Sequence, residues 1–212
     1  MAKKEGIRKL FDNIAGDYDR LNHILSLNID KSWRRKAVKE IADTAEPLNI
    51  LDEACGTCDF TIEIAKAAPQ GSKITGIDLS EGMLQIGREK CCKEGITAEL
   101  QTGDCEAMPY EDETFDRIGV AFGVRNFENL PKGLTEMHRV LKPEGKLVIL
   151  ELSIPRNPIV RWCYYYSLLL ISLNGIITKS LSYISLCGTV SSGQSILLSP
   201  KSNISMSIGR SV

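Results

Sequence analysis

The feature of the sequence that most constrains the fold is a glycine-bearing turn after one apolar strand, together with an acidic residue at the end of the next strand. The run LDEACGTCDF predicts a strand over residues 49–54, a tight turn at Gly56 and a helix that opens at Asp59. A second apolar segment, residues 73–77, is followed by Asp78. This arrangement is typical of the first half of a nucleotide-binding α/β unit. There the turn lets the backbone approach a ligand, and the acid accepts hydrogen bonds from a ribose diol.

Strands and helices alternate along the middle of the chain, which predicts a parallel sheet with helices on both faces. The expected fold class is therefore α/β, with a doubly wound, Rossmann-like and mostly parallel sheet. The expected strands are residues 49–54, 73–78, 98–102, 116–121 and 146–152, and the expected helices are residues 59–68, 80–94 and 131–141. Ligands of such sheets bind beyond the carboxyl ends of the strands.

The segment ahead of the sheet is expected to be helical. Apolar residues at helical spacing, Ile7, Phe11 and Ile14 among them, predict one helix, and a second is expected from about residue 30 to residue 43. The stretch from Tyr18 up to the second helix is expected to form a loop and a short helix. The chain then divides into a helical cap, a Rossmann-like core and a tail, over residues 1–45, 46–158 and 159–212.

The composition excludes several classes of protein. A chain of 212 residues with a formal net charge of −1 suits one domain and gives no indication of a nucleic-acid partner. The N-terminus lacks the apolar run of a signal peptide. Seven cysteines, an odd number, fit a reducing compartment better than a disulfide framework. The expected location is therefore cytoplasmic.

Cys55 and Cys58 form a C-x-x-C pair, which occurs in zinc and redox sites and also in turns packed with small residues. No second pair accompanies them, and His23 and His138 lie far away in the sequence. A structural zinc ion needs four such ligands. We therefore expect no metal and interpret the pair as packing.

The last part of the chain has an unusual composition. All 27 acidic residues lie at or before Glu151, and serine is abundant in residues 159–212. Residues 162–177 form the longest apolar stretch, but polar residues interrupt it and it is shorter than the ~20 residues that cross a bilayer. It is expected to form a core helix or to lie at a membrane surface. Residues 194–198 and 204–208 are compatible with two short strands.

Three segments that follow strands carry candidate binding residues, each with a structural alternative. Asp78 either binds a ribose diol or caps the next helix. Asp104 follows the third strand, where it either meets the exocyclic amine of an adenine or forms a solvated turn. Arg125, in AFGVRNFEN, either lies at the mouth of the cleft or holds a surface loop through an ion pair.

Two classes of enzyme fit such a sheet. A nicotinamide-dependent oxidoreductase normally carries G-x-G-x-x-G, whereas Gly56 is the only glycine of this turn. S-adenosylmethionine has no phosphate, and its carboxylate would be stabilised by the N-terminus of the helix that opens at Asp59. The turn therefore favours a methyl-donor site, and an NAD-dependent oxidoreductase is the alternative.

Several motifs together resemble the ubiquinone/menaquinone biosynthesis C-methyltransferase family. They are YDRLNHILSLNIDKSWRRKAV, ACGTCD, GIDLSEGMLQIGREK, FGVRNFEN and MHRVLKPEGKLVILELSIP, and the resemblance covers about residues 5–158. It implies a class I S-adenosylmethionine-dependent methyltransferase. The implied reaction methylates a ring carbon of a polyprenylated quinol, either demethylmenaquinol or the benzoquinol precursor of ubiquinone. Such a substrate is compatible with peripheral contact between the protein and the membrane. The resemblance is also compatible with a homo-oligomer.

The resemblance also implies roles for particular residues. Those that match the family's cofactor contacts are Gly56, Thr57, Asp78, Asp104 and Cys105, with Ala121 where members often have serine. Those that match positions near the quinol are Tyr18, Arg125 and Asn126. Because Arg125 stays protonated, its expected role is electrostatic stabilisation of the phenolate or positioning of a proton-accepting water, ahead of direct action as a base.

Three departures from the family pattern carry expectations of their own. Cys58 replaces the second glycine of G-T-G, and its side chain is expected to crowd the methionine part of the cofactor. Glu144 replaces a glycine of K-P-G-G, which the turn absorbs if φ stays negative there. After about Arg161 the family pattern is lost, which suggests an altered reading frame and a loosely packed tail. A degraded, catalytically silent copy that serves as a binding partner is therefore a second alternative.

Overall fold

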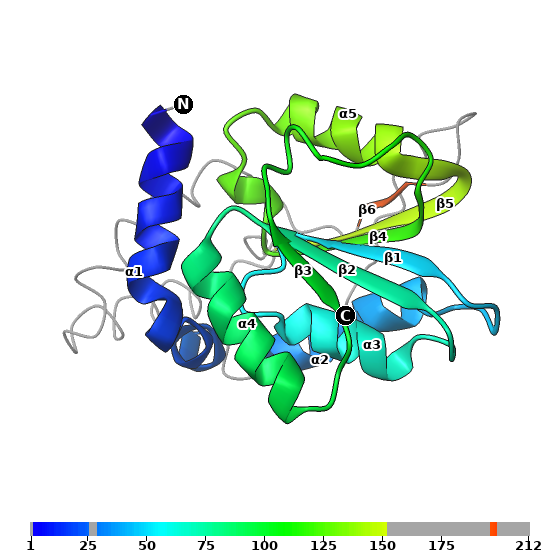
Figure 1. The fold of residues 1–212 in the computed structure, drawn as a ribbon, viewed down its shortest axis with the longest axis horizontal. Coiled ribbons are helices and arrows are strands. Elements are labelled where there is room, and N and C mark those ends of the chain that lie inside the picture. Colours follow the sequence, from blue (N-terminus) through cyan, green and yellow to red (C-terminus); the bar gives the residue numbers. More distant parts are fainter. Residues whose placement is uncertain (1, 26–28, 152–195, 199–212) are drawn as a thin grey trace, which may run out of the picture.

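The computed structural model describes residues 2–25, 29–151 and 196–198, and these form an α/β fold (Figure 1). Two helices precede the sheet, α1 (Ala2–Leu25) and α2 (Ile29–Ile41). The strands are β1 (Asn49–Glu53), β2 (Lys73–Asp78), β3 (Glu99–Thr102), β4 (Phe115–Ala121), β5 (Leu141–Leu150) and β6 (Ile196–Leu198). The helices between them are α3 (Asp59–Ala67), α4 (Glu81–Lys93), the 3-10 helix η1 (Val124–Asn126) and α5 (Leu130–Val140).

The described strands form one sheet in the order β3-β2-β1-β4-β5-β6. Strands β1 to β5 pair in parallel, and β6 pairs antiparallel with β5. The chain runs outward from β1 to β3 and then returns to β4 on the other side of β1. A reversal of this kind opens a crevice at the carboxyl ends of the strands. The expected doubly wound, mostly parallel sheet is confirmed.

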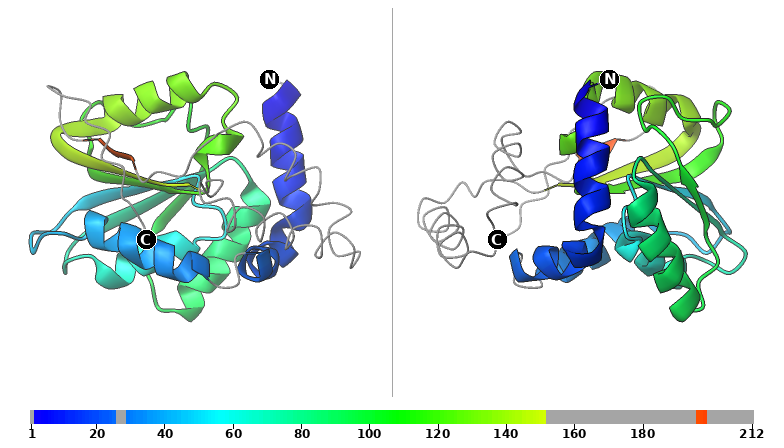
Figure 2. Two further views of the ribbon diagram at one scale, coloured as in Figure 1. Left: turned by 180° about the vertical axis from the view of Figure 1, so that it is seen from behind. Right: turned by 60° about the vertical axis from the view of Figure 1, so that its left-hand side comes forward.

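Apolar side chains alternate between the two faces of the sheet. Leu51 of β1 clusters with Met137 of α5, whereas its neighbour Ile50 clusters with Phe60 of α3. Successive side chains of a strand point to opposite faces, so α5 and α3 cover opposite faces (Figures 1 and 2). Leu51 and Ile50 are fully buried, and such burial stabilises the fold by about 1.5–3 kcal/mol per side chain. The packed sheet fixes the positions of the loops at its strand ends.

Helix α1 runs beside α4 (Figure 1). Its Ile7, Phe11 and Tyr18 line a pocket together with residues of the loops at the carboxyl ends of the strands. The expected loop after Tyr18 is wrong, because α1 continues to Leu25. Gly16 is the last glycine before Leu25, and no proline lies between them. One glycine costs a helix about 1 kcal/mol relative to alanine, which is too little to end it here.

Strand β5 begins at Leu141, earlier than the expected residue 146. The register with β4 shifts there, because residues 142–145 bulge between two paired positions. Pro143 has no N–H to donate to a neighbouring strand, and proline in sheets is found at such bulges. The φ angle of Glu144 is not positive. Its backbone therefore meets the condition under which the turn tolerates a side chain.

The tail is described only at β6, which lies within the expected strand 194–198. The expected strand at residues 204–208, the apolar stretch 162–177 and the loosely packed tail lie outside the described residues. Among the helices of residues 2–25 and 29–151, none is long and apolar enough to cross a membrane.

Candidate active site

The turn after β1 has an unusual backbone conformation. Ala54, Gly56 and Cys58 have φ angles of 54°, 54° and 66°, which is a region that glycine adopts without steric cost. The Gly56 N–H donates a 2.8 Å hydrogen bond to Oδ2 of Asp78. The turn is thereby bound to the end of β2, and the two parts of the sequence motif meet in space.

Asp78 organises both loops. Its Oδ1 accepts a 2.9 Å hydrogen bond from the Ser80 N–H, while Oδ2 accepts the bond from Gly56. Burial raises the pKa of the Asp78 carboxyl, and the backbone N–H groups oppose that shift. Ser80, not Asp78, caps α4 by accepting a bond from the Met83 N–H at 3.1 Å. Because a carboxylate oxygen accepts more than one hydrogen bond, Asp78 retains capacity for hydroxyl groups in the pocket that it lines.

The loop after β3 is held by a lysine from α1. Lys4 Nζ lies 2.7 Å from Oδ2 of Asp104 and 2.9 Å from Oε2 of Glu106. The other oxygen of Asp104 accepts the Glu106 N–H at 2.9 Å. Burial opposes ionisation of both acids, but the bonds from Lys4 and from backbone N–H groups prevail and lower the pKa of each. Both carboxyl groups are therefore charged at neutral pH.

A pocket with about 660 Å³ of empty space, part of it open to solvent, lies at the carboxyl ends of the strands and against α1. Its place at the carboxyl ends of the strands is where ligands of such sheets bind. The site residues predicted from sequence that line it are Tyr18, Gly56, Asp78, Asp104, Cys105, Ala121 and Asn126. Most of its apolar wall comes from Ile7, Phe11, Leu79, Met83, Phe122 and Phe127. Thr57 and Arg125, two further predicted residues, are not among its lining.

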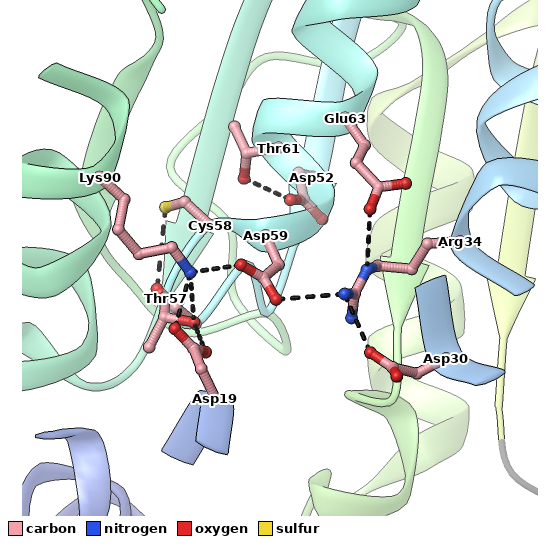
Figure 3. A network of polar contacts seen from close by, with 11 residues as sticks. Asp19, Asp30, Arg34, Asp52, Thr57, Cys58, Asp59, Thr61, Glu63 and Lys90 are labelled. Carbon is pink, nitrogen blue, oxygen red and sulfur yellow. Dashed lines mark hydrogen bonds and ion pairs between the residues drawn. The ribbon is translucent and has the colours of Figure 1, made fainter. Parts of the chain in front are cut away.

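Thr57 instead fastens the turn to two helices. Its hydroxyl donates a 2.5 Å hydrogen bond to Oδ1 of Asp19 on α1 (Figure 3). Lys90 of α4 lies 2.7 Å from the other oxygen of Asp19 and also contacts Asp59 at the start of α3. Burial opposes the charge of Lys90, but these two carboxylates prevail and raise its pKa.

Arg34 of α2 extends the same network. Its guanidinium lies 2.9 Å from Asp30, 3.2 Å from Asp59 and 3.4 Å from Glu63 (Figure 3). The Arg34 side chain is only 7% exposed, and a charge buried to that extent requires close partners. The first turn of α3, and the loop that precedes it, are therefore held by both helices of the N-terminal cap.

Cys58 packs outside the pocket, which contradicts the expectation that it crowds the cofactor. Its side chain is buried in a cluster with Cys55, Cys91 and Leu84. Gly87 of α4 makes room for it, since a Cβ added at Gly87 would overlap the Cys58 sulfur. The three thiols are free, and burial raises the pKa of Cys91 to about 11. Buried thiols in apolar surroundings react poorly, so the structure favours the packing interpretation of the C-x-x-C pair.

Arg125 forms an ion pair with Glu151, as the structural alternative for this residue predicted. Its Nη1 lies 2.5 Å from Oε1 of Glu151, directly after β5, and the two side chains are 7% and 10% exposed. The guanidinium also lies 5.8 Å from the centre of the Phe122 ring, and Phe122 lines the pocket. The pair joins the loop that carries η1 to the end of β5, and the neighbouring Asn126 reaches the pocket.

Charged residues of α1 also hold the site, and they were not predicted from the sequence. Asp12 accepts hydrogen bonds from the Ser80 hydroxyl at 2.5 Å and from the Gly82 N–H at 3.1 Å. Lys4, Asp12 and Asp19 recur about every two helical turns, so they lie along one side of α1. Each contacts a different loop, after β3, β2 and β1 respectively. Charged residues at this spacing on an amphipathic helix were the signal available in the sequence.

Comparison with models of protein families shows the family of the chain. The model of the ubiE/COQ5 methyltransferase family matches residues 1–190. The chain belongs to this family. The match runs past residue 158, where the resemblance was expected to end, and reaches into the tail. An altered reading frame in the tail stays a prediction.

Similar proteins of the ubiE/COQ5 family are known from several bacteria. A demethylmenaquinone methyltransferase of Bacteroides fragilis is 48% identical over 82% of this chain and 71% of its own length. The ubiquinone/menaquinone biosynthesis C-methyltransferase UbiE of Geotalea uraniireducens is 45% identical over 77% of this chain and 70% of its own length. A demethylmenaquinone methyltransferase of Staphylococcus saprophyticus is 39% identical over 84% of this chain and 77% of its own length. The ubiE/COQ5 member described here is thus an enzyme of the methyltransferase class.

Solved structures agree with the fold. A SAM-dependent methyltransferase from Aquifex aeolicus is 26% identical, with a TM-score of 0.53 over 59% of this chain and 66% of that chain. The cyclase SpnF is 24% identical and has a TM-score of 0.54 over 60% of this chain and 46% of that chain. The likeness to a cyclase concerns the fold alone, and function has to be argued from the site.

Proposed function

We propose that this ubiE/COQ5 family member transfers the methyl group of S-adenosylmethionine to a ring carbon of a polyprenylated quinol. The observation that carries the proposal is the pocket at the strand ends, which combines the acids Asp78 and Asp104 with an apolar, aromatic wall. Relatives named demethylmenaquinone methyltransferase and UbiE support a quinol substrate. The substrate is accordingly demethylmenaquinol or the benzoquinol precursor of ubiquinone.

The lining of the pocket fits S-adenosylmethionine. Asp78 has oxygens with capacity for the two ribose hydroxyls, and Asp104 can accept a bond from the adenine amine. Gly56 exposes backbone close to the ligand, while Cys105 and Ala121 give the pocket small side chains. Thr57 supports this surface from behind, because it ties the turn to α1. The bound cofactor supplies an electrophilic methyl group.

Tyr18 and Asn126 are the proposed contacts of the quinol. Both line the same pocket as Asp78, and a phenol and an amide can hydrogen-bond to the oxygens of a quinol. Phe122 and Phe127 offer aromatic faces to its ring. The ring carbon becomes a good nucleophile once a neighbouring hydroxyl has lost its proton, so polar contacts that favour the phenolate lower the barrier.

Arg125 enters the proposal as a positioning residue. Its charge is balanced by Glu151 at 2.5 Å, which weakens any direct action on a phenolate. The ion pair instead fixes the loop that carries Phe122 and Asn126, and both of these line the pocket. Misplacement of such contacts by about 1 Å can cost a hundredfold in rate.

The proposal includes the organisation of the chain. We divide it into a helical cap (residues 1–45), the methyltransferase core (46–158) and an atypical tail (159–212). The cap supplies Tyr18 to the pocket, so it belongs to the active site and is more than a structural addition. We place the enzyme in the cytoplasm, in contact with the membrane surface where its prenylated substrate resides.

Isothermal titration with S-adenosylmethionine and with NAD tests the cofactor. We expect saturable binding of S-adenosylmethionine at one site per chain and no binding of NAD. Binding of NAD alone would favour the oxidoreductase that the single turn glycine argues against. Binding of S-adenosylmethionine without methyl transfer to either reduced demethylmenaquinone or the benzoquinol precursor of ubiquinone would instead favour the catalytically silent copy.

A further inference from the structure

The ammonium of Lys4 occupies a position at which a cofactor contact is expected. It lies 2.7 Å from Oδ2 of Asp104, and both side chains line the pocket. The other carboxylate oxygen of Asp104 is bound to the Glu106 N–H at 2.9 Å. Oδ2 is therefore the oxygen of Asp104 that is bonded to a group outside its own loop, and that group comes from α1.

Lys4 has a second anchor that a ligand would leave in place. Its Nζ lies 2.9 Å from Oε2 of Glu106. The opposite oxygen, Oε1, accepts the N–H groups of Glu128 and Asn129 at 2.7 and 3.0 Å. Glu106 is thus held by the backbone, and it can keep the ammonium when Lys4 leaves Asp104. The ammonium does not have to become unpaired in the course of the exchange.

The rest of α1 is fastened independently of Lys4. Asp12 is bonded to Ser80 and Gly82 at the start of α4, and Asp19 is bonded to Thr57 and Lys90. A shift of the Lys4 side chain therefore leaves two attachments of the helix intact. The N-terminal end of α1 can respond to a ligand while its centre keeps covering the pocket.

We propose that the Lys4 ammonium competes with the exocyclic amine of the cofactor's adenine for Oδ2 of Asp104, and that the bound cofactor leaves Lys4 paired with Glu106 alone. The inference rests on the proposed binding of S-adenosylmethionine in this pocket. Its consequence is that Lys4 lowers the affinity for adenosyl ligands, because the Lys4–Asp104 contact has to break before the amine can bind. Lys4 acts on binding through Asp104 and takes no part in methyl transfer.

The test compares the wild type with Lys4→Met, which keeps an unbranched apolar stem and a good helix former but removes the ammonium. The ligand is S-adenosylhomocysteine, which is uncharged at sulfur, so that a general electrostatic effect on the sulfonium does not contribute. We expect Lys4→Met to bind it about three- to tenfold more tightly, as loss of one competing, partly exposed ion pair implies. Unchanged or weaker binding would overturn the proposal.

Two further variants act as controls. Lys9→Met removes an equal charge from an exposed position of the same helix, where Lys9 pairs with Glu5, and it should bind the ligand like the wild type. Lys4→Arg keeps a cation opposite Asp104 and should also lack the gain. Thermal unfolding of each variant establishes that it is folded. A gain in Lys9→Met or Lys4→Arg equal to that in Lys4→Met would contradict the competition.

A ligand analogue isolates the amine. In an S-adenosylhomocysteine analogue whose adenine is replaced by purine, the exocyclic amine is absent. We expect removal of the amine to weaken binding more in Lys4→Met than in the wild type, because only the variant offers Asp104 without a competitor. An equal loss in both proteins would overturn the inference and leave the proposed function intact. Failure of the wild type to bind any adenosyl ligand would overturn both.

Discussion

The backbone N–H of Gly56 donates a 2.8 Å hydrogen bond to Oδ2 of Asp78, across 22 residues of sequence. The glycine of the turn after β1 and the acid at the end of β2 therefore act as one unit. Asp78 fixes the turn and at the same time lines the pocket. Mutation of this acid should affect the ligand directly and through the turn.

Asp78→Ala should lower the affinity for S-adenosylmethionine roughly ten- to a hundredfold. Hydrogen bonds to a charged group contribute about 1.5–3 kcal/mol, and each 1.4 kcal/mol is tenfold in affinity. Asp116→Ala is the matched control, because Asp116 accepts a bond from Asn49 at the other end of β1 and does not line the pocket. Titration of both folded variants decides the matter. An S-adenosylmethionine affinity of Asp78→Ala equal to that of the wild type would mean that Asp78 does not contact the cofactor.

Arg125→Lys should reduce turnover about a hundredfold while S-adenosylmethionine affinity holds, because the loop that carries Phe122 and Asn126 loses its fixed position. Lysine keeps the charge but loses the planar fork that faces Glu151. Glu151→Gln, which removes the partner's charge and keeps its size, should reduce kcat in a similar way if the pair positions the loop. Steady-state kinetics of both variants separate the two roles. A normal or faster Glu151→Gln enzyme would mean that the Arg125 charge acts on the substrate directly.

Gly87→Ala should destabilise the protein, because the added Cβ overlaps the Cys58 sulfur in a packed cluster. Overpacking of this kind costs about 1–3 kcal/mol. In the Cys58→Gly background the overlap is gone, and the same change should be neutral or stabilising, since alanine favours a helix by about 1 kcal/mol over glycine. Denaturant unfolding of the wild type, the two single variants and the double variant gives the coupling free energy between positions 58 and 87. Additive effects would contradict the packing described for Cys58.

Cys58→Gly alone should leave the cofactor affinity within about threefold of the wild type, because Cys58 does not line the pocket. This expectation replaces the crowding that the sequence suggested. A large gain or loss of affinity, measured by titration, would show that the Cys58 side chain reaches the ligand after all.

Asp52 should make the stability of the protein depend on pH. Its carboxyl is buried and accepts a 2.5 Å bond from the Thr61 hydroxyl, and burial raises its pKa from 3.8 to about 7. A raised pKa means that the folded state holds the proton longer than the unfolded state, so this group lowers stability as pH rises from about 4 to 7. Asp52→Asn removes that effect. Its advantage over the wild type should grow across this window, up to roughly 4 kcal/mol, and stay constant above pH 7.

Urea unfolding of the wild type and Asp52→Asn at several pH values between 4 and 8 measures this difference. Curves of stability against pH that run parallel would mean that Asp52 ionises in the folded protein as it does in the unfolded chain.

Local sequence signals predicted the strands and the turn because they depend on residues close together in the chain. Apolar runs bounded by Gly56 and Asp78 describe β1, its turn and β2 with errors of one residue or less. Seven of the nine expected site residues line one pocket. Six of them end or follow strands, and the carboxyl ends of parallel strands meet at one edge of the sheet. The seventh, Tyr18, comes from α1.

The remaining features depend on partners far away in the sequence. The direction of the Cys58 side chain is set by Gly87 on another helix, and the place of Arg125 is set by Glu151. Lys4 meets Asp104 across 100 residues. The spacing of charged residues along α1 indicated that Lys4 has a role, but no local pattern identifies the distant partner of Lys4, Cys58 or Arg125.

The most direct test of the account is a methyl-transfer reaction with a substrate of defined structure. The purified protein is incubated with S-adenosylmethionine labelled in its methyl group and, in separate reactions, with short-chain demethylmenaquinol and the short-chain benzoquinol precursor of ubiquinone. The products are examined by mass spectrometry and carbon NMR. We predict one labelled methyl group on a ring carbon and one S-adenosylhomocysteine per product. Label on a quinol oxygen, or no product from either quinol although the cofactor and the quinols bind, would contradict the proposed C-methylation.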